Sequence, residues 1–229
     1  MQFHPLAGSI FEKSSTPLQF WLYAMYLLVQ NKSGVSAKQL QRQLGVTYKT
    51  AWRIAQKVRE LMDETKGPKL KGDVEVDEGF FGGSTHFRKH KFAQGTEGKE
   101  VYMAMVERKG RVIVKQLYGT GKQALIEPIK EHIKEGSRII TDQYSGYKNI
   151  DKEGYKHNSI NRSKFIYRTG DVHIQNIENF WSHIKRGIYG TYRHVSVKHL
   201  PKYANEYAFR YNHRKRNGQM FNDLLARLA

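Results

Sequence analysis

The 229-residue sequence contains no cysteine and no apolar segment long enough to cross a membrane. Without cysteine, the chain can form neither disulfides nor a cysteine-ligated zinc site. The longest apolar run, residues 18–29, contains Gln19 and falls short of the roughly 20 residues that span a bilayer, so it predicts a buried helix. The first residues lack the ordered basic, apolar and small-residue regions of a secretory signal. These absences favour a protein of the reducing cytoplasm with no membrane partner.

Acidic residues are also scarce, because 21 Asp and Glu stand against 39 Lys and Arg, which gives a formal net charge of +18. Such an excess predicts a polyanionic partner. Nucleic acid is the first choice, because each neutralised phosphate releases condensed counterions. A basic protein that is merely soluble is the alternative. Hydrophobic residues make up 39% of the chain and aromatic residues 12%, which is enough for a packed core.

The N-terminal segment, through about Thr65, is predicted to be helical. Residues 14–16 (Ser-Ser-Thr) can cap a first helix, and Pro17 suits its first position. Residues 66–72 (KGPKLKG) have no periodicity and are rich in Gly, Pro and Lys. We therefore expect a small all-α domain over residues 1–66 and a second domain over residues 67–229.

A helix-turn-helix pattern occupies the later part of the first domain. Ser36 can cap a short helix through Gln43, and Gly45 can turn the chain. Thr47 can then cap a longer helix. In such a motif the second helix enters the major groove of DNA with its early residues facing base edges. Those residues are Tyr48, Lys49, Thr50 and Arg53. An ordinary helical hairpin is the alternative.

The second domain begins with strand-forming patterns. We predict, in order, a strand within 73–83, a basic loop within 84–100, a hairpin over 101–118, a helix over 122–135, strands at 138–142 and near 156–160, and a long helix from about His173. RNase H-like nucleases use this order of elements. We therefore expect the α/β fold class, with an RNase H-like mixed sheet flanked by helices.

Three acidic residues stand where a metal-dependent phosphodiester chemistry would need them. Asp77 interrupts an apolar strand, Asp142 ends the strand RIITD, and Glu178 borders the apolar stripe of the long helix. A lone acid among apolar strand residues is costly unless it is paired or bound to metal. The carboxyl ends of strands present ligands in open α/β sheets. Two magnesium ions with oxygen ligands suit phosphodiester chemistry. Singly, each acid fits equally well as a turn, cap or surface residue.

Basic residues follow the third acid toward the C-terminus. Lys185 lies seven residues after Glu178, two helical turns further on, where a cation can hold a DNA phosphate. Residues 181–217 carry nine Lys or Arg, interleaved with Tyr and His, which suits phosphate contacts and stacking. From this segment we expect DNA contacts by Lys185, Arg186, Arg193, Arg210 and Arg214. The loop from His86 to Lys91 is similarly basic, and a solvated basic face is the alternative.

Three motifs carry a family resemblance. VDEGFFGG, IITDQYSGY and the run of residues 173–214, which begins HIQNIENFWSHIKRG, resemble the DDE transposases of bacterial insertion sequences. FEKSSTPLQFW and the helix-turn-helix also look like this group, so the similarity covers nearly the whole chain. The resemblance implies the RNase H-like fold shared with retroviral integrases. It also implies Asp77, Asp142 and Glu178 as metal ligands and Lys185 as a catalytic, DNA-contacting cation.

The chain departs from that family in two respects. Full-length members of the subgroup begin with a cysteine-rich zinc ribbon that is missing here, so recognition of element ends is expected to be weaker or to rest on the helix-turn-helix alone. Some relatives carry Asn at the third acid, and Asn176 lies two residues before Glu178. Residues two positions apart face different sides of a helix, so only one can reach the site. We prefer Glu178.

The activity that the resemblance implies is metal-dependent cleavage at element ends, which exposes a 3′ hydroxyl that attacks target DNA. Mg²⁺ is the expected cofactor, with Mn²⁺ as a substitute. Double-stranded DNA is the expected partner, bound by a homo-oligomer that is cytoplasmic and associated with the nucleoid. Two alternatives stay open: a non-catalytic DNA-binding regulator derived from a transposase, and an RNase H-like nuclease that joins no strands.

Overall fold

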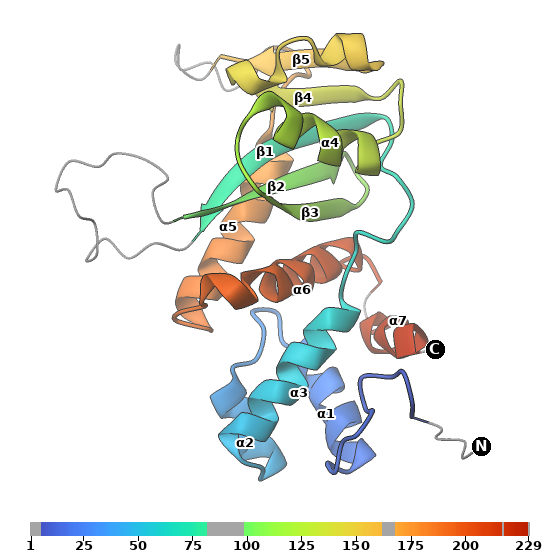
Figure 1. Ribbon diagram of the computed structural model, residues 1–229, viewed down its shortest axis with the longest axis vertical. Coiled ribbons are helices and arrows are strands. Elements are labelled where there is room, and N and C mark those ends of the chain that lie inside the picture. The colour runs from blue at the N-terminus through green and yellow to red at the C-terminus, as the bar shows by residue number, and fades with distance from the viewer. Residues whose placement is uncertain (1–5, 82–98, 162–167, 217, 229) are drawn as a thin grey trace, which may run out of the picture. The chain divides into compact units, whose positions relative to one another are not determined.

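The computed structural model describes residues 6–81, 99–161, 168–216 and 218–228, shown as a ribbon in Figure 1. Its backbone contacts divide the chain into two compact units. The helical unit comprises Met1–Asp63, Lys185–His194 and Lys202–Ala229, and the sheet unit comprises Glu64–Ile184 and Val195–Pro201. Within the described ranges, none of the helices has the length and apolar character needed to cross a bilayer.

Three helices open the helical unit: α1 (Leu18–Gln30), α2 (Ala37–Leu44) and α3 (Tyr48–Leu61). The Ser36 side chain accepts a hydrogen bond from the Gln39 backbone N–H and caps α2. Gly45 turns the chain with a φ of 65°, a conformation that favours glycine. The predicted pair of capped helices across a glycine turn is therefore confirmed.

The start of α1 differs from its prediction. Pro17 is the N-cap residue rather than the first helical residue, and no side chain caps the helix. Ser14 instead accepts hydrogen bonds from the Thr16 backbone N–H and the Trp21 indole N–H. The predicted cap at residues 14–16 is wrong, because this hydroxyl organises the preceding turn and a buried indole.

Two C-terminal helices belong to the helical unit: α6 (Leu200–Asn212), from Lys202 onward, and α7 (Met220–Leu225). Phe209 and Leu224 are fully buried in the apolar core that contains Trp21 and Leu28 of α1. The sequence division placed this segment in the second domain. The structure groups it with the N-terminal helices because the apolar faces of α6 and α7 complete their core.

A buried ion pair also joins the N- and C-terminal parts of the helical unit. Arg59 of α3 donates to Glu206 of α6 at 2.7 Å, and both residues are almost fully buried. Arg210 donates to Glu206 at 2.7 Å and Tyr192 donates at 2.9 Å. Burial alone would raise the pKa of Glu206, but the charges of Arg59 and Arg210 outweigh it and lower that pKa.

The sheet unit contains a five-stranded sheet in the order β3-β2-β1-β4-β5. Its strands are β1 (Asp73–Phe81), β2 (Glu100–Glu107), β3 (Val112–Leu117), β4 (Arg138–Asp142) and β5 (Lys156–Ile160). β1 pairs with β2 and β2 with β3 in antiparallel fashion, whereas β4 is parallel to β1 and to β5. The predicted succession of strands along the chain and the mixed sheet are confirmed.

Two helices pack against this sheet: α4 (Lys122–His132) and the first part of α5 (Gln175–Gly190). α4 ends three residues before the predicted position, because the chain becomes extended at Ile133, which bridges Leu70. Residues of α5 from Lys185 onward group with the helical unit. The basic loop predicted from His86 to Lys91 lies outside the described residues.

We expect Glu206→Gln to destabilise the protein by about 3–5 kcal/mol, because it leaves the buried Arg59 charge without its partner. Since the pKa of Glu206 is lowered on folding, the difference from wild type should be complete above its ordinary pKa of 4.5 and should shrink as the pH falls below that value. Urea unfolding at several pH values measures both. Glu12→Gln, at an exposed site, is the matched control; equal stability of the two variants would contradict the prediction.

Candidate active site

The two faces of β1 have different chemistry. Val74 and Val76 belong to the apolar cluster that includes Leu125 and Ile129 of α4. The alternate residues Glu75, Asp77 and Gly79 therefore point to the opposite face. That face meets α5: Glu75 contacts its first turn, and a Cβ added to Gly79 would lie 2.9 Å from the Trp181 ring. The first half of β1 thus presents Val74 and Val76 to α4, and Glu75 and Asp77 to the side of α5.

Asp77 and Asp142 occupy matching positions on adjacent parallel strands. The pairing of β1 with β4 runs as far as Glu75 and Ile140; continued two residues further along both strands, the same register brings Asp77 level with Asp142. Residues in register on parallel strands point to the same face, about 4.8 Å apart. The two aspartates are thus neighbours on the face that meets α5, with Asp77 in the middle of β1 and Asp142 at the carboxyl end of β4.

Glu178 lies on α5 between the residues that contact β1. Asp77 stands between Glu75, which contacts α5 at Asn176 and Ile177, and Gly79, which lies against Trp181. Glu178 falls between these two contact points on α5 and is partly exposed. We therefore expect Glu178 to lie on the same side of the sheet as the two aspartates.

The start of α5 is fixed by a buried carboxylate that the sequence reasoning did not single out. Glu75, fully buried, accepts hydrogen bonds from the backbone N–H groups of Asn176 at 2.9 Å and Ile177 at 3.1 Å. The Asn176 side-chain amide donates to it at 2.8 Å, and Arg108 donates at 3.0 Å. A carboxylate at a helix N-terminus satisfies otherwise unpaired N–H groups and complements the helix dipole. Glu75 thereby fixes the first turn of α5, which carries Glu178.

The same bonds bear on the choice between Asn176 and Glu178. The Asn176 amide is engaged with Glu75, whereas the Glu178 side chain is partly exposed. This arrangement supports Glu178 as the third acid. The alternation of acids in VEVDE was the signal that could have pointed to Glu75, because it places Glu75 and Asp77 on one face of the strand.

The strand ends form a region of negative potential. Burial, together with the charges of Asp77 and Asp142, raises the pKa of Glu78 to about 8. The hydroxyl of Tyr147, a buried residue, donates a hydrogen bond to Glu78. Because both aspartates act on Glu78, they lie close enough to add their fields at one place, which would attract a cation.

The donor atoms fit a divalent metal that is only partly enclosed by protein. Among the described residues, no three His, Asp or Glu side chains stand close enough together to hold one ion. Magnesium, however, commonly binds one or two carboxylates and completes its shell with water and substrate phosphates. Oδ1 of Asp142 is buried and has no hydrogen-bond partner among the described groups. A cation would satisfy that oxygen, so the pair Asp77 and Asp142 fits a metal completed by DNA.

The residues predicted to contact bases all lie at the start of α3. The Tyr48 side chain is exposed, as is Lys49, while Thr50 and Arg53 are partly exposed. Lys38 of α2 stands over the Tyr48 ring at 5.4 Å, and Thr50 shares a hydrogen bond with its capping threonine. The exposed side chains remain available to DNA, and their contact with bases stays a prediction.

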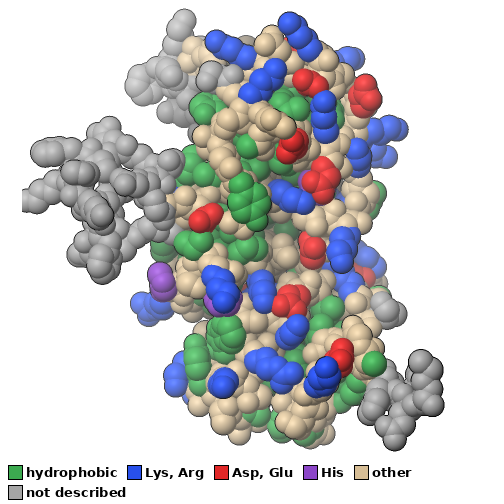
Figure 2. All heavy atoms as spheres, in the orientation of Figure 1, with side chains coloured by type: hydrophobic (Ala, Val, Ile, Leu, Met, Phe, Trp, Pro, Cys, Tyr) green, Lys and Arg blue, Asp and Glu red, His purple; other side chains and the backbone are tan. Residues whose placement is uncertain are grey.

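The predicted basic DNA contacts divide into surface and interior residues. Lys185, Arg186 and Arg193 are exposed, and Arg214 is partly exposed above the Tyr211 ring. Figure 2 shows Lys and Arg side chains spread over the face in view, with Asp and Glu between them. Lys185 follows Glu178 on the same helix, as predicted.

Arg210 has a structural role instead. Its side chain is only 11% exposed and pairs with Glu206. The guanidinium also donates to the backbone carbonyls of Leu28 and Asn31. The sequence grouped Arg210 with the surface cations because its burial depends on residues almost two hundred positions away. Little of the Arg210 side chain is exposed for contact with a phosphate.

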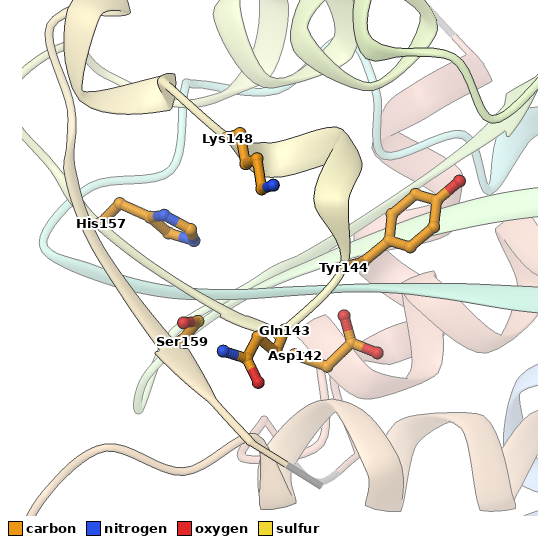
Figure 3. A pocket seen from close by; sticks show the side chains of 6 residues that line it. All are labelled: Asp142, Gln143, Tyr144, Lys148, His157 and Ser159. Atoms are coloured by element: carbon orange, nitrogen blue, oxygen red, sulfur yellow. The ribbon is translucent and has the colours of Figure 1, made fainter. Parts of the chain in front are cut away.

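A pocket of about 450 Å³ adjoins Asp142 (Figure 3). Its lining residues are Asp142, Gln143, Tyr144, Lys148, His157 and Ser159. His157 lies 2.9 Å from the Thr141 hydroxyl, and its backbone N–H donates to Asp151. Burial lowers the pKa of His157 despite the opposing charge of Asp151, which favours a neutral ring. The sequence reasoning identified none of the pocket residues except Asp142.

A mixed sheet in this order, with acids on its adjacent central strands β1 and β4, is the RNase H-like fold of DNA-processing enzymes. Residues 69–212 match the family described as the ISXO2-like transposase domain. The chain belongs to that family, and the resemblance to DDE transposases of insertion sequences is confirmed.

Two relatives agree with this assignment. The chain is 26% identical over 225 residues to an uncharacterized protein in transposable element ISH50 of Halobacterium salinarum, a match that covers 91% of this chain and 74% of that protein. It is 28% identical over 96 residues to an uncharacterized transposase-like protein of Haemophilus influenzae, covering 42% of this chain and 76% of the relative.

Glu75→Ala should destabilise the sheet unit by about 3–5 kcal/mol, because it leaves Arg108 and two N–H groups of α5 without their buried partner. Glu75→Gln keeps one acceptor oxygen and should lose less. Denaturant unfolding followed by tryptophan fluorescence measures the change, with the exposed Glu127→Ala as control. A stability loss in Glu75→Ala no larger than in the control would refute this role.

Proposed function

We propose that this transposase cuts DNA at the ends of an insertion sequence and joins them to target DNA, using divalent metal ions held by Asp77, Asp142 and Glu178. Mg²⁺ is the proposed cofactor, with Mn²⁺ as a substitute. The family assignment supports transposition as the process, and the arrangement of acids supports the chemistry.

The observation that carries this proposal is the register of β1 and β4. It sets Asp77 beside Asp142 on the face that meets α5, and Asp142 contributes a buried oxygen that lacks a hydrogen-bond donor among the described groups. Two adjacent carboxylates repel each other unless a cation or proton lies between them. The adjacent carboxylates of Asp77 and Asp142 are therefore unfavourable without a cation, as expected for a metal-binding site.

Each residue then has a distinct role. Asp77 and Asp142 would hold metal together with a DNA phosphate, and Glu178 would complete the ligand set from the facing helix. The bound metals would activate the attacking oxygen and stabilise the leaving oxygen. Lys185, exposed on the same helix as Glu178, would bind a phosphate of the DNA strand.

The proposed reaction has two balanced steps. In cleavage, the oxygen of water attacks the phosphorus at the element end, the bond from phosphorus to the 3′ oxygen breaks, and that oxygen leaves as a 3′ hydroxyl. In joining, this hydroxyl attacks a target phosphate and gives up its proton. The displaced 3′ oxygen of the target takes up a proton. No redox partner is needed.

DNA would be held by both units of the chain. The exposed start of α3 would contact bases, and the exposed cations Arg186 and Arg193 would contact phosphates. Because two element ends must react together, we also propose that the protein acts as a homo-oligomer on double-stranded DNA.

Asp142→Asn should lower metal-dependent nicking of supercoiled plasmid by more than about 100-fold, since even the neighbours of metal ligands change activity 10–100-fold when mutated. DNA binding in a gel-shift assay should remain near the wild-type level, because only one oxygen of a metal ligand is exchanged. Glu127→Gln, an exposed carboxyl-to-amide change on α4, is the control.

Wild-type nicking rates in Asp142→Asn would remove this residue from the site. If the wild-type protein binds DNA but shows no nicking with Mg²⁺ or Mn²⁺, it is a DNA-binding regulator. If it nicks but does not join pre-cleaved ends to a target plasmid, it is a nuclease of the same fold.

Glu178→Gln should weaken Mn²⁺ binding by about 10-fold or more, whereas Asn176→Ala should leave it within about threefold of wild type. The reason is that the Asn176 amide bonds to Glu75, so its loss affects the attachment of α5 instead. Mn²⁺ titration followed by electron paramagnetic resonance measures binding, and thermal unfolding measures stability. The reverse pattern would make Asn176 the third ligand.

A further inference from the structure

The pocket beside Asp142 lies at the carboxyl end of β4, where the chain leaves the sheet. Asp142 belongs both to the proposed metal site and to the pocket wall. In Figure 3, Lys148, His157, Ser159 and Gln143 surround one space, while the Asp142 carboxylate extends away from it. The register pairs Ser159 with Thr141, so Ser159 lies on the face of the sheet opposite the Asp142 carboxylate, and the pocket and the acidic site share the end of β4.

The lining chemistry suits a nucleotide better than a metal or an acidic peptide. Lys148 is exposed and has no ion-pair partner among the described residues. Gln143 and Ser159 offer neutral hydrogen-bonding groups, and the lowered pKa of His157 adds a third. One cation combined with several neutral donors and acceptors matches one phosphate attached to a base and a sugar. The volume of about 450 Å³ lies within the range of small-ligand pockets.

Tyr144 supplies a flat surface next to this pocket. Its side chain is 42% exposed, although its hydroxyl donates to the Thr120 carbonyl and its ring packs edge-on against Tyr147. An aromatic ring held at its edge and its hydroxyl, but open to solvent, can stack with a base without losing much conformational freedom. Proteins that bind single-stranded nucleic acid combine such rings with cations in this way.

We propose that this pocket binds one unpaired nucleotide of a DNA strand that passes the carboxyl end of β4. Lys148 contacts its phosphate, Tyr144 stacks on its base, and Gln143 and Ser159 supply hydrogen bonds. This inference rests on the proposed function for its choice of ligand. It adds that the protein distinguishes frayed or single-stranded ends from fully paired DNA.

The test compares two labelled probes without divalent metal: a short blunt duplex, and the same duplex with a single-stranded 3′ extension of a few nucleotides. Fluorescence anisotropy should show that the wild-type protein prefers the extended probe. Tyr144→Ala should bind that probe at least about fivefold more weakly, as expected for the loss of stacking on one base. Tyr144→Phe, which keeps the ring, should retain the preference.

Lys148→Ala should lower the slope of log affinity against log salt by about 0.7, the value for one phosphate contact to a single strand. Lys152→Ala removes the same charge from an exposed position outside the pocket and should leave the slope and the preference unchanged. Thermal unfolding confirms that each variant is folded. Retention of the wild-type preference by folded Tyr144→Ala, or an unchanged slope in Lys148→Ala, overturns the proposal.

Because these binding measurements need no DNA cleavage, they test the pocket independently of the proposed enzymatic function. If the wild-type protein nicks DNA and Tyr144→Ala still prefers the extended probe, nucleotide binding in the pocket is refuted and the proposed enzymatic function stands. If the wild-type protein never nicks DNA and Tyr144→Ala loses the preference, the proposed enzymatic function is refuted and the pocket stands as a DNA-binding site.

Discussion

The bond between a buried carboxylate and the first turn of a helix determines the geometry of the candidate site. Glu75 on β1 holds the backbone of Asn176 and Ile177 on α5. Asp77 follows two residues later on the same face of the strand, and Glu178 follows within the same helical turn. Any shift of α5 along β1 would break these bonds in a buried place, where unpaired N–H groups are costly. Glu75, which is not itself a proposed metal ligand, thereby fixes the position of Glu178 on α5 relative to Asp77 on β1.

The acidic face imposes a cost that explains its surroundings. Asp77 and Asp142 lie level on adjacent strands, and their charges add to burial in raising the pKa of Glu78 to about 8. The sheet tolerates this concentration of charge because the opposite face of β1 packs Val74 and Val76 against the apolar side of α4. Apolar packing on the α4 side of β1 stabilises the sheet, so the opposite side can carry carboxylates that bind a cation.

The helical unit solves a different problem, because it assembles its core from both ends of the chain. Phe209 and Leu224 fill the core around Trp21, and Arg59 reaches Glu206 inside the same unit. Buried charges of this kind require a matched partner, which makes the pairing of the N- and C-terminal segments specific. Because Arg210 also pairs with the buried Glu206, its side chain is not part of the basic surface formed by neighbouring residues in the sequence.

The sequence by itself determined the elements whose signals are local. Ser36, Gly45 and Thr47 fixed the ends of α2 and α3, and period-two and helical patterns located the strands and the positions of Asp77, Asp142 and Glu178. Tertiary structure alone decided that Glu75 anchors α5, that Tyr144 and Lys148 border a pocket, and that Arg210 is internal. These outcomes depend on contacts between residues that only the fold brings together, some of them nearly two hundred positions apart. Caps, turns and periodicity carry no information about such partners.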